Sequence, residues 1–189
     1  DIHDFIKKLV IKTGGRCFLL FTSYSSLNYV YNKLRGSLEK DNYVLLKQGD
    51  LPRHEMIEMF KMSNKAVLFG TDSFWEGIDV QGDNLKSVVI IKLPFKSPED
   101  PVTEAIIEYM RKNNQNPFMN FQIPQAVIKF KQGIGRLIRS KTDTGIITIL
   151  DNRVIKKAYG EKFLKSLPKT NIVKGNRDFI LKDKDKNKV

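Results

Sequence analysis

The sequence SVVIIKL at residues 87–93 decides the fold of this 189-residue chain. It holds four consecutive β-branched apolar residues, without the polar alternation of a strand that has one face in water. A strand of this kind is buried on both faces, which is typical of a parallel sheet with helices on each side. The stretch therefore predicts an α/β domain.

Other short apolar runs extend this prediction along the chain. We expect strands at residues 16–21, 43–46, 66–69, 87–93 and 146–150. Between them, apolar residues recur at helical spacing: Leu27, Val30, Tyr31 and Leu34; Met56, Met59 and Phe60; and Val102, Ile106, Tyr109 and Met110. Alternating strands and helices predict a doubly wound α/β domain with a mostly parallel sheet and helices on both faces.

A further helix is expected at residues 124–139, and it carries the most informative polar residues. Its apolar side chains fall on one broad face that only Ile128 breaks, while Gln132, Arg136 and Arg139 cluster on the opposite face. Neighbouring guanidinium groups repel each other, and a phosphate would relieve that repulsion through paired hydrogen bonds. Gly135 leaves room for close approach of such a ligand. The alternative interpretation is a solvated helix face.

In doubly wound folds ligands bind beyond the carboxyl ends of the strands, so the segments there are candidates for a site. Residues 22–26, TSYSS, follow the first strand and lead into a helix. At least one serine caps that helix, and the remaining donors could contact a nucleic-acid phosphate.

Residues 70–82, GTDSFWEGIDVQG, follow the third strand. Glu76 and Asp79 could accept hydrogen bonds from a ribose or hold a metal-bound water, while Thr71 and Ser73 could donate to a phosphate. The structural alternative is a turn in which the aromatic pair Phe74–Trp75 is simply buried.

The amino-acid composition limits the classes of function that the chain could have. The net charge of +12 and the pI near 9.7 favour a phosphate-rich partner, although part of the excess lies in the lysine-rich tail. The single cysteine, Cys17, excludes a disulfide or a cysteine-ligated cluster within the chain. With no apolar run of membrane-spanning length and no signal peptide, we expect a cytoplasmic protein without membrane contact. The first residue, Asp1, suggests a piece of a longer protein.

Two nucleotide-site patterns are not met. Residues 146–151 resemble the strand and aspartate that hold magnesium in P-loop enzymes, but no glutamate follows Asp151 and the chain has no G-x-x-x-x-G-K-[ST] loop. No G-x-G-x-x-G follows the first strand either, which disfavours a dinucleotide enzyme. The chain thus has arginines that could serve a triphosphate but no loop to cradle one.

Four blocks occur in an order that identifies a family. They are LFTSY at residues 20–24, the loop at 70–82, LPF at 93–95, and QGIGRLIR at 132–139 followed by LDNR at 150–153. Over residues 17–168 the chain resembles the second motor domain of DinG-type helicases, in the XPD-like branch of superfamily 2. The resemblance implies a RecA-like fold that lacks its own Walker A loop.

The resemblance also implies roles for individual residues. Arg136 and Arg139 match motif VI and would act as arginine fingers on the γ-phosphate, with Gln132 coupled to the nucleotide. Gly135, Glu76, Gly77 and Asp79 would lie on the nucleotide side. Ser23, Tyr24, Thr71 and Asp72 would lie near the nucleic acid.

The partners implied are single-stranded or forked DNA and the first RecA-like domain of the same polypeptide. That domain would bring most of the site for ATP and magnesium, and in many relatives an iron-sulfur cluster, so we expect no metal site in this chain and no ATPase activity from it alone. We expect residues 1–15 to lead in from the preceding domain, residues 16–170 to form the motor domain, and residues 171–189 to form a basic, flexible tail. The resemblance further implies a bacterial protein that is associated with the nucleoid.

Two other functions stay open. The chain could be a non-catalytic nucleic-acid-binding module, which its charge and missing Walker lysine favour. It could instead be the motor half of a DinG-like exonuclease, although it holds no cluster of nuclease carboxylates.

Overall fold

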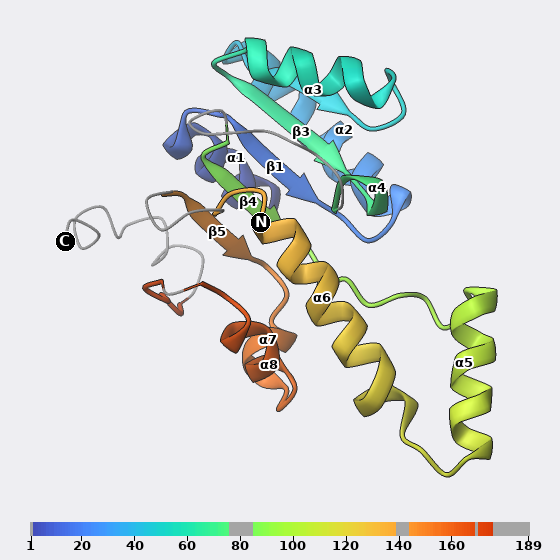
Figure 1. Ribbon diagram of the computed structural model, residues 1–189. Helices are drawn as coiled ribbons and strands as arrows, with labels where there is room; N and C mark the ends of the chain where they lie inside the picture. The colour runs from blue at the N-terminus through green and yellow to red at the C-terminus, as the bar shows by residue number, and fades with distance from the viewer. Residues whose placement is uncertain (1, 76–84, 139–143, 169, 176–189) are drawn as a thin grey trace.

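A computed structural model of the chain describes residues 2–75, 85–138, 144–168 and 170–175 (Figure 1). Its centre is a sheet of five parallel strands in the order β2-β3-β1-β4-β5. The strands are β1 (Cys17–Leu20), β2 (Val44–Lys47), β3 (Ala66–Gly70), β4 (Ser87–Ile90) and β5 (Ile146–Ile149). The predicted doubly wound α/β fold is confirmed, and within the described residues every strand pair is parallel.

Helices connect the strands and flank the sheet. They are α1 (Ile2–Thr13), α2 (Tyr24–Lys40), α3 (Arg53–Met62), the single turn α4 (Asp72–Trp75), α5 (Pro101–Lys112), the π-helix η2 (Phe118–Gln122), α6 (Ile123–Ile134), α7 (Arg153–Lys156) and α8 (Gly160–Lys165). None of the helices in the described part of the chain is both long and apolar enough to span a bilayer.

Alternate residues of the central strands point to opposite faces of the sheet and belong to two hydrophobic cores. Phe18 and Leu20 of β1 face a core closed by α3, α6 and α8, which includes Phe60, Phe130 and Phe163. Cys17 and Leu19 face the opposite core, which α1 and α2 close. Both faces of the sheet are therefore covered, as the run of β-branched residues in β4 requires.

The first helix belongs to this second core. Phe5, Ile6, Leu9 and Val10 of α1 are buried in the same cluster as β1 and α2. The segment that was expected to lead in from a preceding domain is thus packed onto the sheet of this one.

Helix α5 forms where it was expected, but the residues predicted to mark its apolar face are not the ones buried. Thr103 and Ile107 are buried, whereas Val102 is 65% exposed and Tyr109 is 68% exposed. The helix lies at the margin of the molecule, apart from the sheet (Figure 1), and Thr103 and Ile107 are its buried residues.

The arginine-bearing helix is shorter than predicted. α6 ends at Ile134, with Gly135 as its C-cap, and residues 135–137 form a turn. Glycine is unfavourable inside a helix, and the turn brings the side chain of Leu137 into the core at 5% exposure. Arg136 therefore lies beyond the regular helix, not on its polar face, and the prediction of a continuous helix to Arg139 is wrong. Ile128 is 51% exposed, as its position off the apolar face requires.

Candidate functional site

The carboxyl ends of β1, β2 and β3 meet around one side chain, Gln48, which directly follows β2. Its Oε1 accepts hydrogen bonds from the backbone nitrogen of Thr71 at 2.5 Å and from Thr71 Oγ1 at 3.1 Å. Its Nε2 donates to Tyr24 Oη at 2.6 Å and to Ser73 Oγ at 2.9 Å. A single amide thus connects the start of α2, the end of β3 and the turn α4.

This arrangement brings together two residues that the sequence placed near a nucleic acid, Tyr24 and Thr71. Tyr24 is 52% exposed and Thr71 is buried at 4% exposure. Gln48 was not among the residues predicted from the sequence. The signal was present: a glutamine follows an apolar strand and precedes Gly49, whose φ of +101° marks a turn.

Ser23 has a structural task. It is the N-cap of α2, and its side chain accepts a hydrogen bond from the backbone nitrogen of Ser26 at 3.3 Å. The capping interpretation is confirmed, and the same hydroxyl shares a hydrogen bond with Ser25 Oγ at 3.2 Å. Asp72 is the first residue of α4.

The aromatic pair after β3 is buried, as the structural interpretation held. Phe74 is 1% exposed and Trp75 is fully buried, and Trp75 Nε1 donates to the backbone oxygen of Phe21 at 2.9 Å. The indole also lies against α6 at Gly133, where a Cβ atom would stand 2.6 Å from Trp75 Cε3. The turn after β3 is thereby fixed between the end of β1 and the last turn of α6.

Three of the predicted nucleotide-contacting residues, Gln132, Gly135 and Arg136, lie on that last turn and just after it. Gln132 is exposed, and Gly135 and Arg136 are half-buried. The nearest atom to a Cβ at Gly135 would be the backbone oxygen of Lys131, 3.0 Å away, so the immediate neighbours of Gly135 are its own helix. Glu76, Gly77, Asp79 and Arg139 lie outside the described residues.

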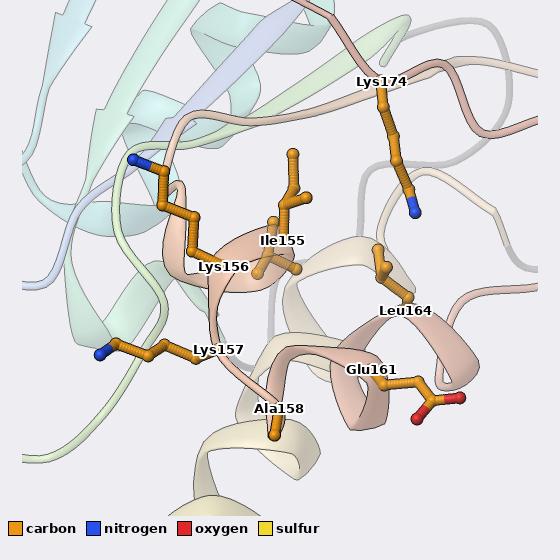
Figure 2. A pocket seen from close by; sticks show the side chains of 8 residues that line it. Ile155, Lys156, Lys157, Ala158, Glu161, Leu164 and Lys174 are labelled. Atoms are coloured by element: carbon orange, nitrogen blue, oxygen red, sulfur yellow. The ribbon is translucent and has the colours of Figure 1, made fainter.

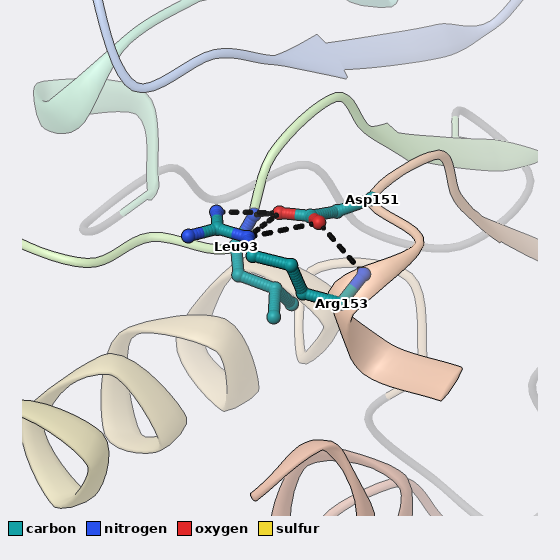
Figure 3. A network of polar contacts seen from close by, with 3 residues as sticks. All are labelled: Leu93, Asp151 and Arg153. Atoms are coloured by element: carbon teal, nitrogen blue, oxygen red, sulfur yellow. Dashed lines mark hydrogen bonds and ion pairs between the residues drawn. The ribbon is translucent and has the colours of Figure 1, made fainter. Parts of the chain in front are cut away.

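Asp151, the aspartate that resembles a magnesium ligand, forms a structural anchor (Figure 3). Its carboxylate accepts from the backbone nitrogen of Leu93 at 2.9 Å and from Arg153, both at the backbone nitrogen at 3.0 Å and at the guanidinium down to 2.6 Å. Burial favours a raised pKa for Asp151, but the hydrogen bonds from Arg153 and Leu93 outweigh it and lower the pKa. The anchor joins the segments that follow β4 and β5.

Cys17 is the single cysteine of the chain and lies in β1. Burial raises the pKa of the Cys17 thiol to about 12, so this side chain is a small core residue. No group of three or more histidine, cysteine, aspartate and glutamate side chains that could hold a metal ion occurs in the parts of the chain that the structure describes.

A shallow pocket of about 300 Å³ lies between α7, α8 and Lys174 (Figure 2). Ile155 and Leu164 contribute its apolar surface, and Lys156, Lys157 and Lys174 border it. The side chains of these lysines point in different directions (Figure 2), so they do not converge on one anion.

A five-stranded parallel sheet between two helical layers, with a polar cluster at the carboxyl ends of the strands, is the RecA-like fold of helicase domains. Among solved structures, an XPD helicase matches with a TM-score of 0.65 and 20% identity over 87% of this chain and 30% of that chain. Domain 2 of the DEAD-box helicase Mss116p matches with a TM-score of 0.54 and 14% identity, over 88% of this chain and 54% of that chain. At these identities the likeness shows the fold alone.

The chain belongs to the helicase C-terminal domain family, whose profile matches residues 6–170. It is 45% identical over 168 residues to the ATP-dependent DNA helicase YoaA of Haemophilus influenzae, covering 89% of this chain and 26% of that protein. It is 40% identical over 174 residues to the 3'-5' exonuclease DinG of Bacillus subtilis, covering 91% of this chain and 19% of that protein. The chain therefore spans about a quarter or less of the length of these relatives.

Proposed function

We propose that this chain is the C-terminal motor domain of a DinG-type, ATP-dependent DNA helicase, in which it supplies arginine fingers and part of the track for single-stranded DNA. The observation that carries the proposal is the position of Trp75. Through one hydrogen bond to Phe21 and one close contact with Gly133, it joins the segment before Tyr24 to the helix turn before Arg136. A change at the nucleotide side would thereby reach the nucleic-acid side through rigid packing.

ATP would lie against the last turn of α6. Gln132 offers an amide, and Arg136 offers a guanidinium that would stabilise the charge that develops on the γ-phosphate. Arg139 would act as a second finger, with Gly135, Glu76, Gly77 and Asp79 lining the nucleotide. Because this chain has no G-x-x-x-x-G-K-[ST] loop, the phosphate cradle and the magnesium ligands would come from a first RecA-like domain of the same polypeptide.

An iron-sulfur cluster, where the whole protein has one, would also belong to that other part. The chain contains one cysteine, and the buried, protonated thiol of Cys17 does not suit a cluster ligand. We accordingly propose that the chain by itself neither hydrolyses ATP at an appreciable rate nor unwinds DNA.

The nucleic acid would be single-stranded or forked DNA that crosses the carboxyl ends of the strands. Ser23, Tyr24, Thr71 and Asp72 would contact it there, and the net charge of +12 would attract its phosphates without regard to sequence. Such a protein would work in the bacterial cytoplasm at the nucleoid.

The test is the steady-state, single-strand-stimulated ATPase of the whole protein, wild type against Arg136→Ala and Arg139→Ala, with ATP binding measured separately. We expect turnover to fall by about 100-fold or more in either variant while ATP still binds. Lys131→Ala is the matched control, because it removes a positive charge from the exposed face of the same helix end. Turnover that stays within twofold of wild type in both arginine variants would contradict the proposal and would favour a non-catalytic nucleic-acid-binding module.

A second candidate is the motor half of an exonuclease. It is favoured by the relative in Bacillus subtilis, which is named a 3'-5' exonuclease and is 40% identical to this chain. Incubation of the whole protein with single-stranded DNA labelled at the 5' end separates the two: progressive shortening from the 3' end supports the exonuclease, whereas intact strands together with ATP-dependent unwinding of a fork support the helicase.

A further inference from the structure

The side-chain amide of Gln48 has its hydrogen-bonding capacity fully used. A glutamine amide can donate two hydrogen bonds and accept two. Nε2 donates to Tyr24 Oη and Ser73 Oγ, and Oε1 accepts from the nitrogen and the hydroxyl of Thr71. The amide cannot be reversed, because the backbone nitrogen of Thr71 can only donate and must therefore meet an oxygen.

The side chains that Gln48 holds differ in how firmly the rest of the protein fixes them. Tyr24 is 52% exposed and sits at the first position of α2, and Ser73 is exposed in the turn α4. Exposed side chains of this kind exchange between rotamers, and fixing them when a ligand binds costs free energy. Thr71, at 4% exposure, is already fixed, so the amide ties two exposed side chains to the rigid end of β3.

We propose that Gln48 is a positioning residue for nucleic-acid binding: one amide sets Tyr24, Thr71 and Ser73 in a fixed arrangement at the carboxyl ends of β1, β2 and β3. The inference rests on the proposed function and deepens it by naming the residue that organises the nucleic-acid surface before the strand arrives. Because these residues already use both donors and both acceptor positions of the Gln48 amide, its effect on binding acts through them.

Two substitutions at Gln48 separate the effect of losing the hydrogen bonds from the effect of adding a charge. Gln48→Leu keeps the approximate size of the side chain and removes all four hydrogen bonds. Gln48→Glu can keep them, because the hydroxyls of Tyr24 and Ser73 can turn and donate to a carboxylate. It adds a negative charge, whose repulsion of a phosphodiester chain is screened by salt.

The experiment measures binding of the whole protein to a fluorescently labelled oligothymidylate of about 20 nucleotides, together with the KM for ATP and the thermal midpoint. For Gln48→Leu we expect the Kd for the strand to rise about tenfold and the KM for ATP to stay close to wild type, while the thermal midpoint of unfolding falls because the buried backbone nitrogen of Thr71 loses its acceptor. For Gln48→Glu we expect weaker binding at low salt that approaches wild type as salt is added. Gln125→Leu, at an exposed position on α6, is the matched control and should leave the Kd unchanged.

A double-mutant cycle gives a readout that general destabilisation would not move. Tyr24→Phe removes the hydroxyl that Gln48 holds, so the effect of Gln48→Leu on the Kd should be smaller in the Tyr24→Phe background. If Gln48→Leu does not fold, Gln48→Glu and Tyr24→Phe decide: a Kd within twofold of wild type for both overturns the inference. An unchanged Kd for a folded Gln48→Leu protein overturns it as well, while failure of the wild type to bind the strand at all overturns the proposed function.

Discussion

The indole of Trp75 lies directly against Gly133, and no side chain larger than hydrogen fits between them. A Cβ atom at Gly133 would stand 2.6 Å from Trp75 Cε3 and 2.9 Å from Cζ3, well inside van der Waals contact. Trp75 cannot retreat without cost, because it is fully buried and its Nε1 donates to Phe21 O at 2.9 Å. The spacing between α4 and α6 is therefore set by a glycine.

The first prediction concerns Gly133→Ala. We expect this substitution to destabilise the protein by about 1–3 kcal/mol, because the added methyl group overpacks a core that is already close-packed. The free energy of unfolding by urea measures the effect. Trp75 is the only tryptophan of the chain, so within this domain its fluorescence reports the displacement of the indole.

Gly36→Ala is the matched control for this prediction. Gly36 also lies inside a helix, α2, but a Cβ there would meet no atom within 4 Å. Replacing glycine by alanine at such a position should stabilise the protein by about 0.5–1 kcal/mol. Equal effects of the same sign in both variants would show that helix propensity, and not the contact with Trp75, governs Gly133.

The second prediction concerns the side of α5 that faces the protein. We expect Ile107→Ala to cost about 2 kcal/mol or more, because Ile107 is 7% exposed and its truncation leaves a cavity. Val102→Ala and Tyr109→Ala should change the free energy of unfolding by less than about 0.5 kcal/mol, since both side chains are mostly in solvent. A larger loss in the Tyr109 variant than in the Ile107 variant would contradict the burial pattern of this helix.

The strands could be predicted from sequence because their signal is local. A short run of β-branched apolar residues such as that in β4 is typical of a strand in a sheet that is covered on both faces. The facing of α5 could not be predicted in this way. Val102, Ile106, Ile107, Tyr109 and Met110 form two overlapping stripes, and only contacts with the rest of the chain decide which stripe is buried.

The candidate site also has a part that local sequence predicts and a part that it does not. Tyr24 and Thr71 were predicted because each follows a recognisable strand, but Gln48 joins them through hydrogen bonds that span 23 and 24 positions. No spacing in the sequence encodes a contact of that range. The end of α6 was misplaced for a related reason: Leu137 continues the apolar spacing of the helix, yet it reaches the core from a turn that begins at Gly135.

The third prediction concerns the reactivity of Cys17. Its side chain is fully buried in β1, and burial raises the pKa of the thiol to about 12. The thiolate is the reactive form, so a thiol-specific reagent at pH 8 should not modify Cys17 in the folded protein. Labelling followed by mass spectrometry of the peptide that contains Cys17 tests this, with the urea-unfolded protein as the positive control. Rapid modification without denaturant would mean that β1 opens readily.

The fourth prediction concerns the anchor between Asp151 and Arg153. The side chain of Asp151 is 7% exposed and accepts charge-assisted hydrogen bonds from Arg153, which also lies 5.3 Å above the ring of Phe95. We expect Asp151→Asn to lower the free energy of unfolding at pH 7 by about 2 kcal/mol, because hydrogen bonds to charged groups are lost and Arg153 keeps its charge without a counter-ion. Glu161→Gln, which breaks an exposed ion pair with Lys165 on α8, is the matched control and should have no measurable effect.

The same anchor predicts how this difference depends on pH. Hydrogen bonds from Arg153 and Leu93 hold the pKa of Asp151 in the folded protein below its ordinary value of 3.8. A carboxyl group whose pKa is lowered by folding stabilises the folded state above its ordinary pKa, and it loses this contribution as the pH falls toward the lowered value. The gap in unfolding free energy between wild type and Asp151→Asn should therefore stay constant from about pH 8 to pH 5 and shrink below about pH 4. Urea titrations at several pH values measure the gap, and a gap that is as large at pH 3 as at pH 7 would mean that ionisation of Asp151 does not contribute to stability.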